Sequence, residues 1–259
     1  MDHLPPDFSD LNRYYEPFLG AGSLFFRLKP LKATLSDNNK ELIDCYKAVK
    51  TRPILLSKYL YEYLKKMKKA NNKEQHYYEI RKKYNKIKKF NRISIAKAAL
   101  FILLNKTCFN GIWRVNQKEE FNVPYGKKDS PSLPKKEDLI SISKALSNVS
   151  LFHRDYKEVL KYARKGDLIY FDPPYPPLNG TSYFRHYTKK IFDWEDHENL
   201  SIIVNKLHQR GCNIMVSNAD IPIVRKLYRS FNIHEKEVTR VIKAKGKRIK
   251  VKEVVIVNY

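Results

Sequence analysis

The chain has 259 residues, enough to bury a sizeable core as one domain or as a core with an insertion. Its net charge of +24 favours a polyanionic partner, although lysine-rich helix faces alone would also produce such a charge. Three widely spaced cysteines and seven histidines without ligand-like spacing predict neither a disulfide framework nor a metal site. No signal peptide or membrane-length apolar run is present, so we expect a cytoplasmic protein without a membrane partner.

The first 50 residues are predicted to form strand, helix, strand and helix. Residues 14–18 lead into Leu19-Gly20-Ala21-Gly22, a turn whose glycines let a ligand approach the backbone closely. A lone G-x-G is weak evidence for a ligand site, because an ordinary strand–helix turn has the same pattern. The third glycine of the dinucleotide-binding fingerprint is absent here. Asp37 ends the second strand, where an acid commonly holds ribose hydroxyls in Rossmann-like folds; a cap for the next helix is the alternative.

Residues 51–145 change in character and are predicted to be a helical insertion. Two helices, from Pro53 onwards and through residues 77–87, are rich in tyrosine and lysine. Residues 95–104 are apolar nearly all round, which is typical of a buried helix. Residues 106–136 are rich in Asn, Gly, Pro and Lys, so we expect a loop with short strands there.

A sheet resumes after the insertion. Strands separated by helices, and then a closing hairpin, are predicted near residues 149–152, 167–171, 213–217, 232–242 and 248–257. This order predicts a Rossmann-like, mostly parallel α/β sheet. Its catalytic core would comprise residues 1–50 and 146–259, with the insertion at 51–145 between two halves of one sheet.

The most informative stretch is Asp172-Pro173-Pro174-Tyr175, which follows the apolar strand 167–171. Ligands of open α/β sheets bind at such strand ends. The prolines have no N–H, so carbonyl oxygens and the Asp172 carboxylate are acceptors for an amino group. The Tyr175 ring can stack on a base. Together they suit the exocyclic amine of a base taken out of its stack, whereas the alternative for Asp172 is an ordinary loop acid.

Several segments resemble the motifs of Dam-type DNA adenine-N6 methyltransferases, including the members that modify GATC. Residues 16–22 are similar to the family's methionine-donor motif, and residues 36–39 to its second donor-binding acid. Residues 105–116, continued by residues 121–126, resemble the target-recognition segment. Asp172 to Tyr175 resemble the catalytic motif, and Ser217-Asn218 and the closing apolar strand also fit. The resemblance spans nearly the whole chain, with the motifs in the family's order.

The resemblance implies methyl transfer from S-adenosylmethionine to N6 of a flipped adenine in double-stranded DNA, within GATC and without a metal. The implied catalytic residues are Asp172, Pro173, Pro174 and Tyr175. The implied donor-binding residues are Glu16, Pro17, Phe18, Gly20, Gly22, Asp37, Asp155 and Asp172. The implied DNA-binding residues are Asn110, Trp113, Arg114, Asn116 and Lys127.

Some of these roles have structural alternatives. Asp155 either faces the donor adenine or caps the helix that begins at Tyr156. Phe18 lines the donor pocket or simply packs in the core. Arg114 reads guanine or clamps a phosphate. Gln117, Lys128, Tyr183, Phe184 and Tyr187 are further candidates for contact with DNA.

Family members usually begin with a Lys-Trp-Ala-Gly-Gly-Lys-like segment that helps to enclose the donor, and this chain starts at Met1-Asp2-His3. We therefore expect a truncated, mis-started or split sequence with weak donor binding. The alternatives are a DNA-binding remnant, or an RNA adenine or protein amide methyltransferase, which usually has Asn ahead of the Pro-Pro pair. The sequence indicates no oligomer and leaves open the exact recognition sequence and a companion restriction endonuclease.

Overall fold

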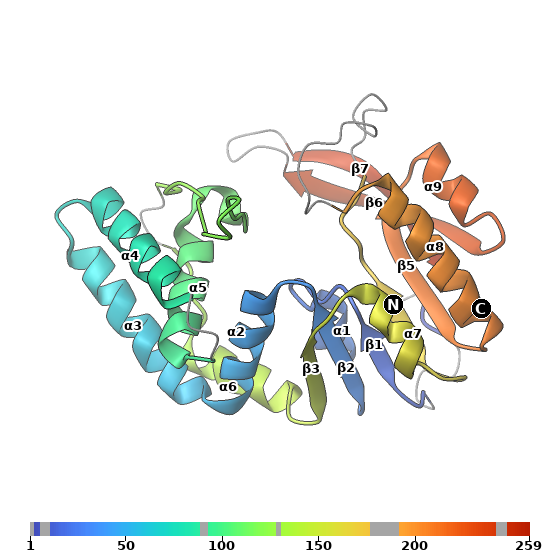
Figure 1. Ribbon diagram of the computed structural model, residues 1–259, viewed down its shortest axis with the longest axis horizontal. Helices are drawn as coiled ribbons and strands as arrows, with labels where there is room; N and C mark the ends of the chain where they lie inside the picture. Colours follow the sequence, from blue (N-terminus) through green and yellow to red (C-terminus); the bar gives the residue numbers. More distant parts are fainter. Residues whose placement is uncertain (1–2, 6–10, 89–92, 128–130, 177–191, 242–247) are drawn as a thin grey trace. The chain divides into compact units, whose positions relative to one another are not determined.

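The computed structural model describes residues 3–5, 11–88, 93–127, 131–176, 192–241 and 248–259. The chain divides into two compact units (Figure 1). We call residues 1–38 with 148–259 the sheet unit, and residues 39–147 the helical unit. The helical unit thus includes residues 39–50, which the sequence-based division had grouped with the catalytic core.

The sheet unit contains seven strands in the order β3-β2-β1-β4-β5-β7-β6. Their bounds are Tyr14–Glu16 (β1), Ala33–Asp37 (β2), Val149–His153 (β3), Leu168–Phe171 (β4), Asn213–Ala219 (β5), Asn232–Val241 (β6) and Arg248–Val257 (β7). Strands β1 to β5 are parallel, whereas β7 runs antiparallel to both β5 and β6. This confirms the predicted Rossmann-like, mostly parallel sheet and its closing hairpin.

Helices of the sheet unit connect these strands. They are α1 (Ser23–Leu28), the 3-10 turn η3 (Tyr156–Glu158), α7 (Val159–Tyr162), α8 (Trp194–Gln209) and α9 (Pro222–Leu227). Helix α8 begins with a capping box, in which Asp193 accepts from the N–H of Asp196 and the Asp196 side chain accepts from the N–H of Asp193. Helix α8 therefore begins directly after Asp193.

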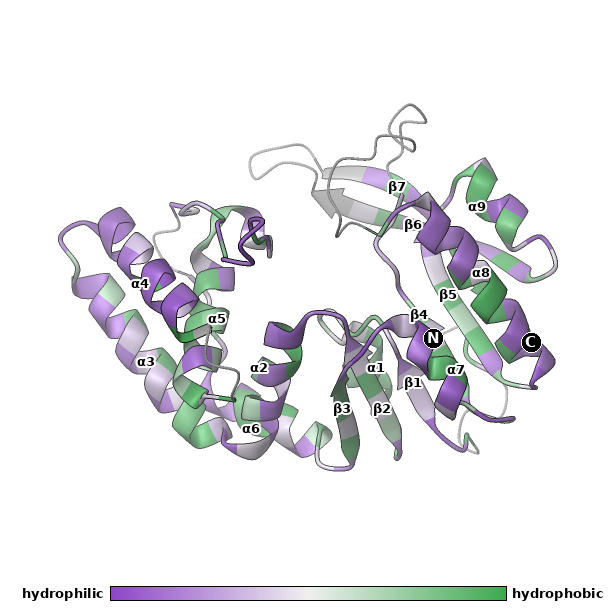
Figure 2. Cartoon of the chain, in the orientation of Figure 1, coloured by the Kyte–Doolittle hydropathy of each residue, from purple (hydrophilic) through white to green (hydrophobic). Residues whose placement is uncertain are grey.

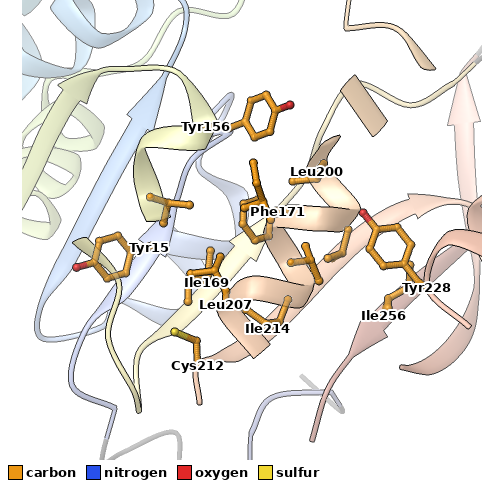
Figure 3. Close-up of a cluster of buried hydrophobic side chains, with 14 of the residues drawn as sticks. Tyr15, Tyr156, Ile169, Phe171, Leu200, Leu207, Cys212, Ile214, Tyr228 and Ile256 are labelled. Carbon is orange, nitrogen blue, oxygen red and sulfur yellow. The ribbon is translucent and has the colours of Figure 1, made fainter. Parts of the chain in front are cut away.

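One face of this sheet packs against α7, α8 and α9. Its buried core includes Tyr15 of β1, Phe171 of β4, Ile214 of β5 and Ile256 of β7 (Figure 3). Since successive side chains of a strand point to opposite faces, Tyr14 and Glu16 of β1 and Tyr170 of β4 face the other way. These polar side chains therefore lie on the face away from α8, next to the carboxyl ends of the central strands.

The helical unit contains α2 (Lys40–Thr51), α3 (Pro53–Lys69), α4 (Lys73–Lys88), α5 (Ile95–Thr107), the 3-10 turn η2 (Phe109–Gly111) and α6 (Lys136–Ala145). Helix α5 packs against α2, α3 and α4, and eight of its residues are buried, which confirms the predicted buried helix. Asn39 caps α2 by accepting from the N–H groups of Glu41 and Leu42. The sequence analysis did not predict α6.

Candidate functional site

The sheet has a topological switch point between β1 and β4, because β2 lies on one side of this pair and β5 on the other. Side chains at the carboxyl ends of β1 and β4 are Glu16 and Asp172, which come from the two motifs singled out in the sequence. Ligands of open α/β sheets bind outside the strand ends at such a point. The topology thus brings together two segments that are about 150 residues apart in the chain.

The turn after β1 is tied to the end of β2. The N–H of Gly20 donates to Oδ2 of Asp37 over 3.0 Å, and the N–H of Leu19 donates to the carbonyl of Ser36 over 3.0 Å. Gly20 and Gly22 have φ angles of 46° and 65°, in the left-handed region that favours glycine. A Cβ on Gly22 would also lie 3.0 Å from the Phe26 ring. Asn39 caps α2, and the Asp37 carboxylate accepts from the glycine turn.

Glu16 lies beneath this turn as a buried acid. Its Oε2 accepts a 2.7 Å hydrogen bond from the Tyr14 hydroxyl. The pKa of Glu16 is raised to about 8, mainly by burial and also by the charge of Asp172, against lowering by the Tyr14 hydroxyl and the Phe25 main chain. Glu16 is therefore largely protonated near neutral pH. The coupling to Asp172 also shows that the two motif acids influence each other.

Phe18 belongs to an aromatic cluster at the same end of the sheet. Its ring stacks on Tyr156, with centroids 5.1 Å apart, and meets Phe192 edge-on at 5.5 Å. Phe18 is half-buried, so it packs on the core and retains accessible surface. Tyr156 and Phe192 were not among the predicted site residues; an aromatic next to Asp155 was the available signal for Tyr156.

Asp155 is exposed, and its Oδ1 accepts from the N–H of Lys157 over 2.9 Å. The capping role that was one alternative for this residue is therefore present. A contact with the adenine of a donor remains a prediction. Pro17, by contrast, is buried directly after β1.

The Asp-Pro-Pro-Tyr segment follows β4 directly. Asp172 is exposed, and Pro173 is buried. Burial raises the pKa of the Tyr170 hydroxyl, and the charge of Asp172 adds to this effect. Tyr175 is half-buried, with its ring against the core and its hydroxyl donating to Oε2 of Glu253 over 3.2 Å. The segment therefore presents the carboxylate to solvent and secures the tyrosine.

His197 of α8 lies buried behind this segment and was not predicted. Its ring meets Phe192 edge-on at 4.7 Å, and neither ring nitrogen makes a hydrogen bond with a described residue. Burial lowers its pKa to about 4, although the Pro174 carbonyl favours the protonated form. The ring is therefore neutral near physiological pH, because burial outweighs the contributions that favour the charged form.

The predicted recognition residues lie on the loop after α5, in the helical unit. Trp113 stacks on Phe121 at 4.7 Å and also contacts Phe101 and Tyr84, so most of its ring packs against this unit's core. The Asn116 side-chain oxygen accepts from the N–H groups of Lys118 and Glu120, which stabilises a turn. These contacts explain both residues structurally, and their contact with DNA remains a prediction.

Arg114, Asn110 and Lys127 are exposed on the same loop. The Nε of Arg114 donates to Oδ1 of Asn122 over 2.9 Å, and its terminal nitrogens bond no residue in the described part of the helical unit. Asn110 and Lys127 have φ angles of 55° and 50°, which place both in the left-handed backbone region that non-glycine residues rarely adopt. Gln117 is also exposed, whereas Lys128, Tyr183, Phe184 and Tyr187 lie outside the described residues.

Helix α4 holds this loop through side chains that the sequence analysis did not single out. Asn85 donates from Nδ2 to the Phe121 carbonyl over 3.0 Å and accepts the Phe121 N–H at Oδ1 over 2.9 Å. Arg81 donates to the carbonyls of Asn122 and Val123, and the Tyr77 hydroxyl donates to the Val123 carbonyl. Isolated strand pairings join Cys108 to Tyr125 and Val115 to Phe121, consistent with the predicted short strands.

Two classes of feature are absent from the part of the chain that the structure describes. It contains no group of three or more His, Cys, Asp or Glu side chains arranged to hold a metal ion. None of its helices combines the length and apolar composition that crossing a membrane requires.

Comparison with known proteins identifies the family. The sequence model of the "D12 class N6 adenine-specific DNA methyltransferase" family matches residues 1–242. The chain is 39% identical to a type II methyltransferase, M1.LlaDCHI, of Lactococcus lactis subsp. cremoris, covering 96% of this chain and 87% of that protein. It is 38% identical to the type II methyltransferase M.MjaIII of Methanocaldococcus jannaschii, covering 100% and 93%. It is 32% identical to the DNA adenine methylase of Escherichia coli K12, covering 89% and 80%.

These matches bear out the resemblance to Dam-type enzymes and the assignment of methyltransferase activity on DNA adenine. They extend over the glycine turn, the loop after α5 and the Asp-Pro-Pro-Tyr segment. The chain belongs to the D12 class of N6 adenine-specific DNA methyltransferases.

Proposed function

We propose that this enzyme takes its methyl group from S-adenosylmethionine and transfers it to N6 of an adenine flipped out of duplex DNA, within the sequence GATC. The observation that carries the proposal is the exposed Asp172 carboxylate at the end of β4, beside the glycine turn that ends β1. The E. coli relative is a DNA adenine methylase, and the two type II relatives suggest a restriction-modification setting with a companion endonuclease.

The glycine turn fits a donor of this kind. Gly20 and Gly22 have no side chain that would keep a ligand away from the backbone, and the Gly20 N–H holds the Asp37 carboxylate in a defined orientation. Asp37 then accepts from ribose hydroxyls, as acids at the second strand end do in related sheets. Phe18 offers a flat apolar wall, and Pro17 and Glu16 support the turn from below. Asp155 follows β3, the strand next to β2, and accepts a hydrogen bond from the adenine amine of the donor.

The chemistry at the acceptor nitrogen is limited by its lone pair, which is delocalised into the adenine ring. S-adenosylmethionine supplies an electrophilic methyl group and leaves a neutral sulfide. Asp172 and the Pro173 carbonyl accept hydrogen bonds from the amino group and so favour a tetrahedral nitrogen in the transition state. Tyr175 stacks on the flipped base, a contact worth about 1–3 kcal/mol in comparable base–aromatic pairs. Alignment of nitrogen and methyl carbon supplies most of the remaining rate enhancement.

Reading of the DNA is assigned to the helical unit. This unit carries 26 of the 51 lysines and arginines but only 10 of the 27 acidic residues. Arg114 is the base reader in this proposal, because its terminal nitrogens remain for the O6 and N7 atoms of guanine when Nε binds Asn122. Asn110, Asn116 and Lys127 contact the same stretch of DNA, and Trp113 anchors this part of the loop on Phe101 and Phe121.

The test combines a product assay with one substitution. Duplexes with GATC, and control duplexes with the same bases scrambled, are incubated with S-adenosylmethionine, and N6-methyladenine is measured by mass spectrometry. We expect product from GATC only. Asp172→Ala should lower turnover by at least about 100-fold, as removal of one transition-state hydrogen-bonding partner does elsewhere, and leave DNA affinity within a few-fold.

In this design, a different outcome contradicts each part of the proposal. Methylation of another sequence overturns the GATC assignment alone, and normal turnover by Asp172→Ala removes Asp172 from the mechanism. Retained DNA binding with no donor binding in calorimetry favours the alternative of a DNA-binding remnant.

A further inference from the structure

The hydroxyl of Tyr175 is bonded to a residue from the far end of the chain. It donates to Oε2 of Glu253 over 3.2 Å, across a sequence separation of 78 residues. The Tyr175 ring meanwhile is partly buried against the hydrophobic core of the sheet unit. The catalytic-motif tyrosine is therefore restrained at both ends of its side chain, by apolar packing and by a carboxylate.

Strand β7 holds Glu253 firmly. It lies between β5 and β6, and Glu253 is in register with Ala219 on one side and Lys236 on the other. The next residue, Val254, is fully buried in the core, so the strand cannot rotate about its axis without losing that packing. Glu253 itself is half-buried and points to the opposite face.

That opposite face also bears Tyr170 of the catalytic strand, whose hydroxyl lies 3.0 Å from Oγ of Ser217. The charge of Glu253 contributes to raising the pKa of Tyr170, after burial, Asp172 and Glu16. Glu253 therefore lies close to the strand that carries Asp172, and its carboxylate is part of the same polar surface.

We propose that Glu253 is a positioning residue for methyl transfer: it orients the Tyr175 ring for stacking on the target adenine. The inference rests on the proposed function, in which Tyr175 stacks on the flipped base. The tyrosine lies between Pro174 and Pro176, and two side-chain torsions decide the plane of its ring. A hydrogen bond from the hydroxyl to a fixed strand restricts both torsions, so less ordering remains when the base enters.

The test is a double-mutant cycle of Glu253→Ala and Tyr175→Phe, with Glu253→Gln as the conservative variant. Loss of one hydrogen bond corresponds to about a 3- to 10-fold lower kcat for Glu253→Ala, with KM for DNA within about twofold. Glu253→Gln keeps an acceptor oxygen and should recover most of the rate. In the Tyr175→Phe background, Glu253→Ala should have no further effect, because the bond is already absent.

A spectroscopic readout separates positioning from folding. With 2-aminopurine at the target position, stacking on Tyr175 quenches the fluorescence of the flipped base, so Glu253→Ala should give a brighter complex. The matched control is Glu237→Ala, an exposed acid of the same hairpin paired with Lys250, which should leave both kcat and fluorescence unchanged.

Wild-type kcat and wild-type fluorescence in Glu253→Ala would overturn the inference. So would an equal loss of rate on adding Glu253→Ala to the wild type and to the Tyr175→Phe variant, since Glu253 would then act through another group. The proposed function is tested independently by the methyladenine product of the unaltered enzyme. If that product forms and the cycle shows no coupling, only the role of Glu253 is lost.

Discussion

The Tyr14 hydroxyl donates a 2.7 Å hydrogen bond to Oε2 of Glu16, two residues further along β1, and both side chains are buried. Alternate residues of a strand share a face, so this pair follows from the strand itself. Burial strongly raises the pKa of both groups, and in Glu16 the rise to about 8 brings a carboxyl group into the physiological range. The site thus contains a group that changes charge near neutral pH.

The first prediction concerns the pH dependence of stability. Glu16 has a folded-state pKa of about 8, above its ordinary value of 4.5, so its contribution to stability is complete below about pH 4.5 and is lost as pH rises through 8. The free energy of unfolding of the wild type should fall between pH 6.5 and 8, by at most about 1.4 kcal/mol per pH unit from this group. Glu16→Gln should flatten that slope in urea unfolding.

Because His197 also titrates, the slopes of the wild type and Glu16→Gln should be compared only above about pH 6.5. Its pKa is lowered to about 4, mainly by burial, so it destabilises the protein as pH falls from 6.5 to 4, which opposes the effect of Glu16. Above pH 6.5 the imidazole is mostly neutral in both states. Identical slopes for wild type and Glu16→Gln above pH 6.5 would show that Glu16 ionises normally.

The second prediction concerns a buried ion cluster in the helical unit. Lys97 of α5 is 3% exposed, and its Nζ lies 3.1 Å from Oε2 of Glu41 and 3.4 Å from Oδ2 of Asp44. Tyr84 donates to Glu41 over 2.8 Å. Lys97→Met removes the shared cation and leaves two buried carboxylates, which should cost about 3–5 kcal/mol in the free energy of unfolding.

The fluorescence of Trp113, in a Trp194→Phe background, measures unfolding of the helical unit alone, since the chain has two tryptophans. Lys40→Met is the matched control, because Lys40 pairs with Asp44 at 2.6 Å but is 37% exposed and should matter by less than about 1 kcal/mol. Equal effects of the two substitutions would contradict the prediction.

The third prediction concerns sequence reading. If Arg114 contacts a base, Arg114→Ala should relax discrimination at one position and cost about 1–3 kcal/mol there. Asn122→Ala, which removes the acceptor for Nε, should relax the same position by a smaller amount. Competition binding with duplexes substituted at each base pair measures both. A uniform loss over all duplexes would instead assign Arg114 to a phosphate.

The fourth prediction concerns the lysines at the end of α3. Lys65, Lys66, Lys68 and Lys69 are all exposed, and the neighbouring helix α4 is predominantly hydrophilic (Figure 2). Replacing the four lysines by Gln should weaken binding to every duplex alike and reduce the slope of log K against log salt, by up to about 0.9 per lysine that contacts a phosphate.

The control for this experiment is the pair Lys226→Gln and Lys236→Gln, two exposed lysines of the sheet unit. An unchanged salt slope in the α3 variant would show that these lysines form an ordinary solvated face. A reduced slope in both variants would instead indicate a general effect of net charge.

Local patterns in the sequence determined most of the elements and their order. Signals that act over a few residues can be recognised without a structure. Examples are the apolar strand before Asp172, the cap at Asn39 and the capping box at Asp193. The nearly all-apolar helix α5 was likewise predictable, since burial on every side needs apolar residues on every side. The motif order identified the family for the same reason, because each motif is contiguous.

Only the tertiary structure decided the partners of individual side chains. In the sequence Lys97 is only a charged interruption of an apolar helix, yet two acids of α2 surround its ammonium group. Trp113 was predicted to contact DNA, and most of its ring packs against Phe101 and Phe121. Glu253 meets Tyr175 across 78 residues of sequence. Periodicity and capping act over one or two turns of chain, whereas these contacts depend on which elements become neighbours when the core packs.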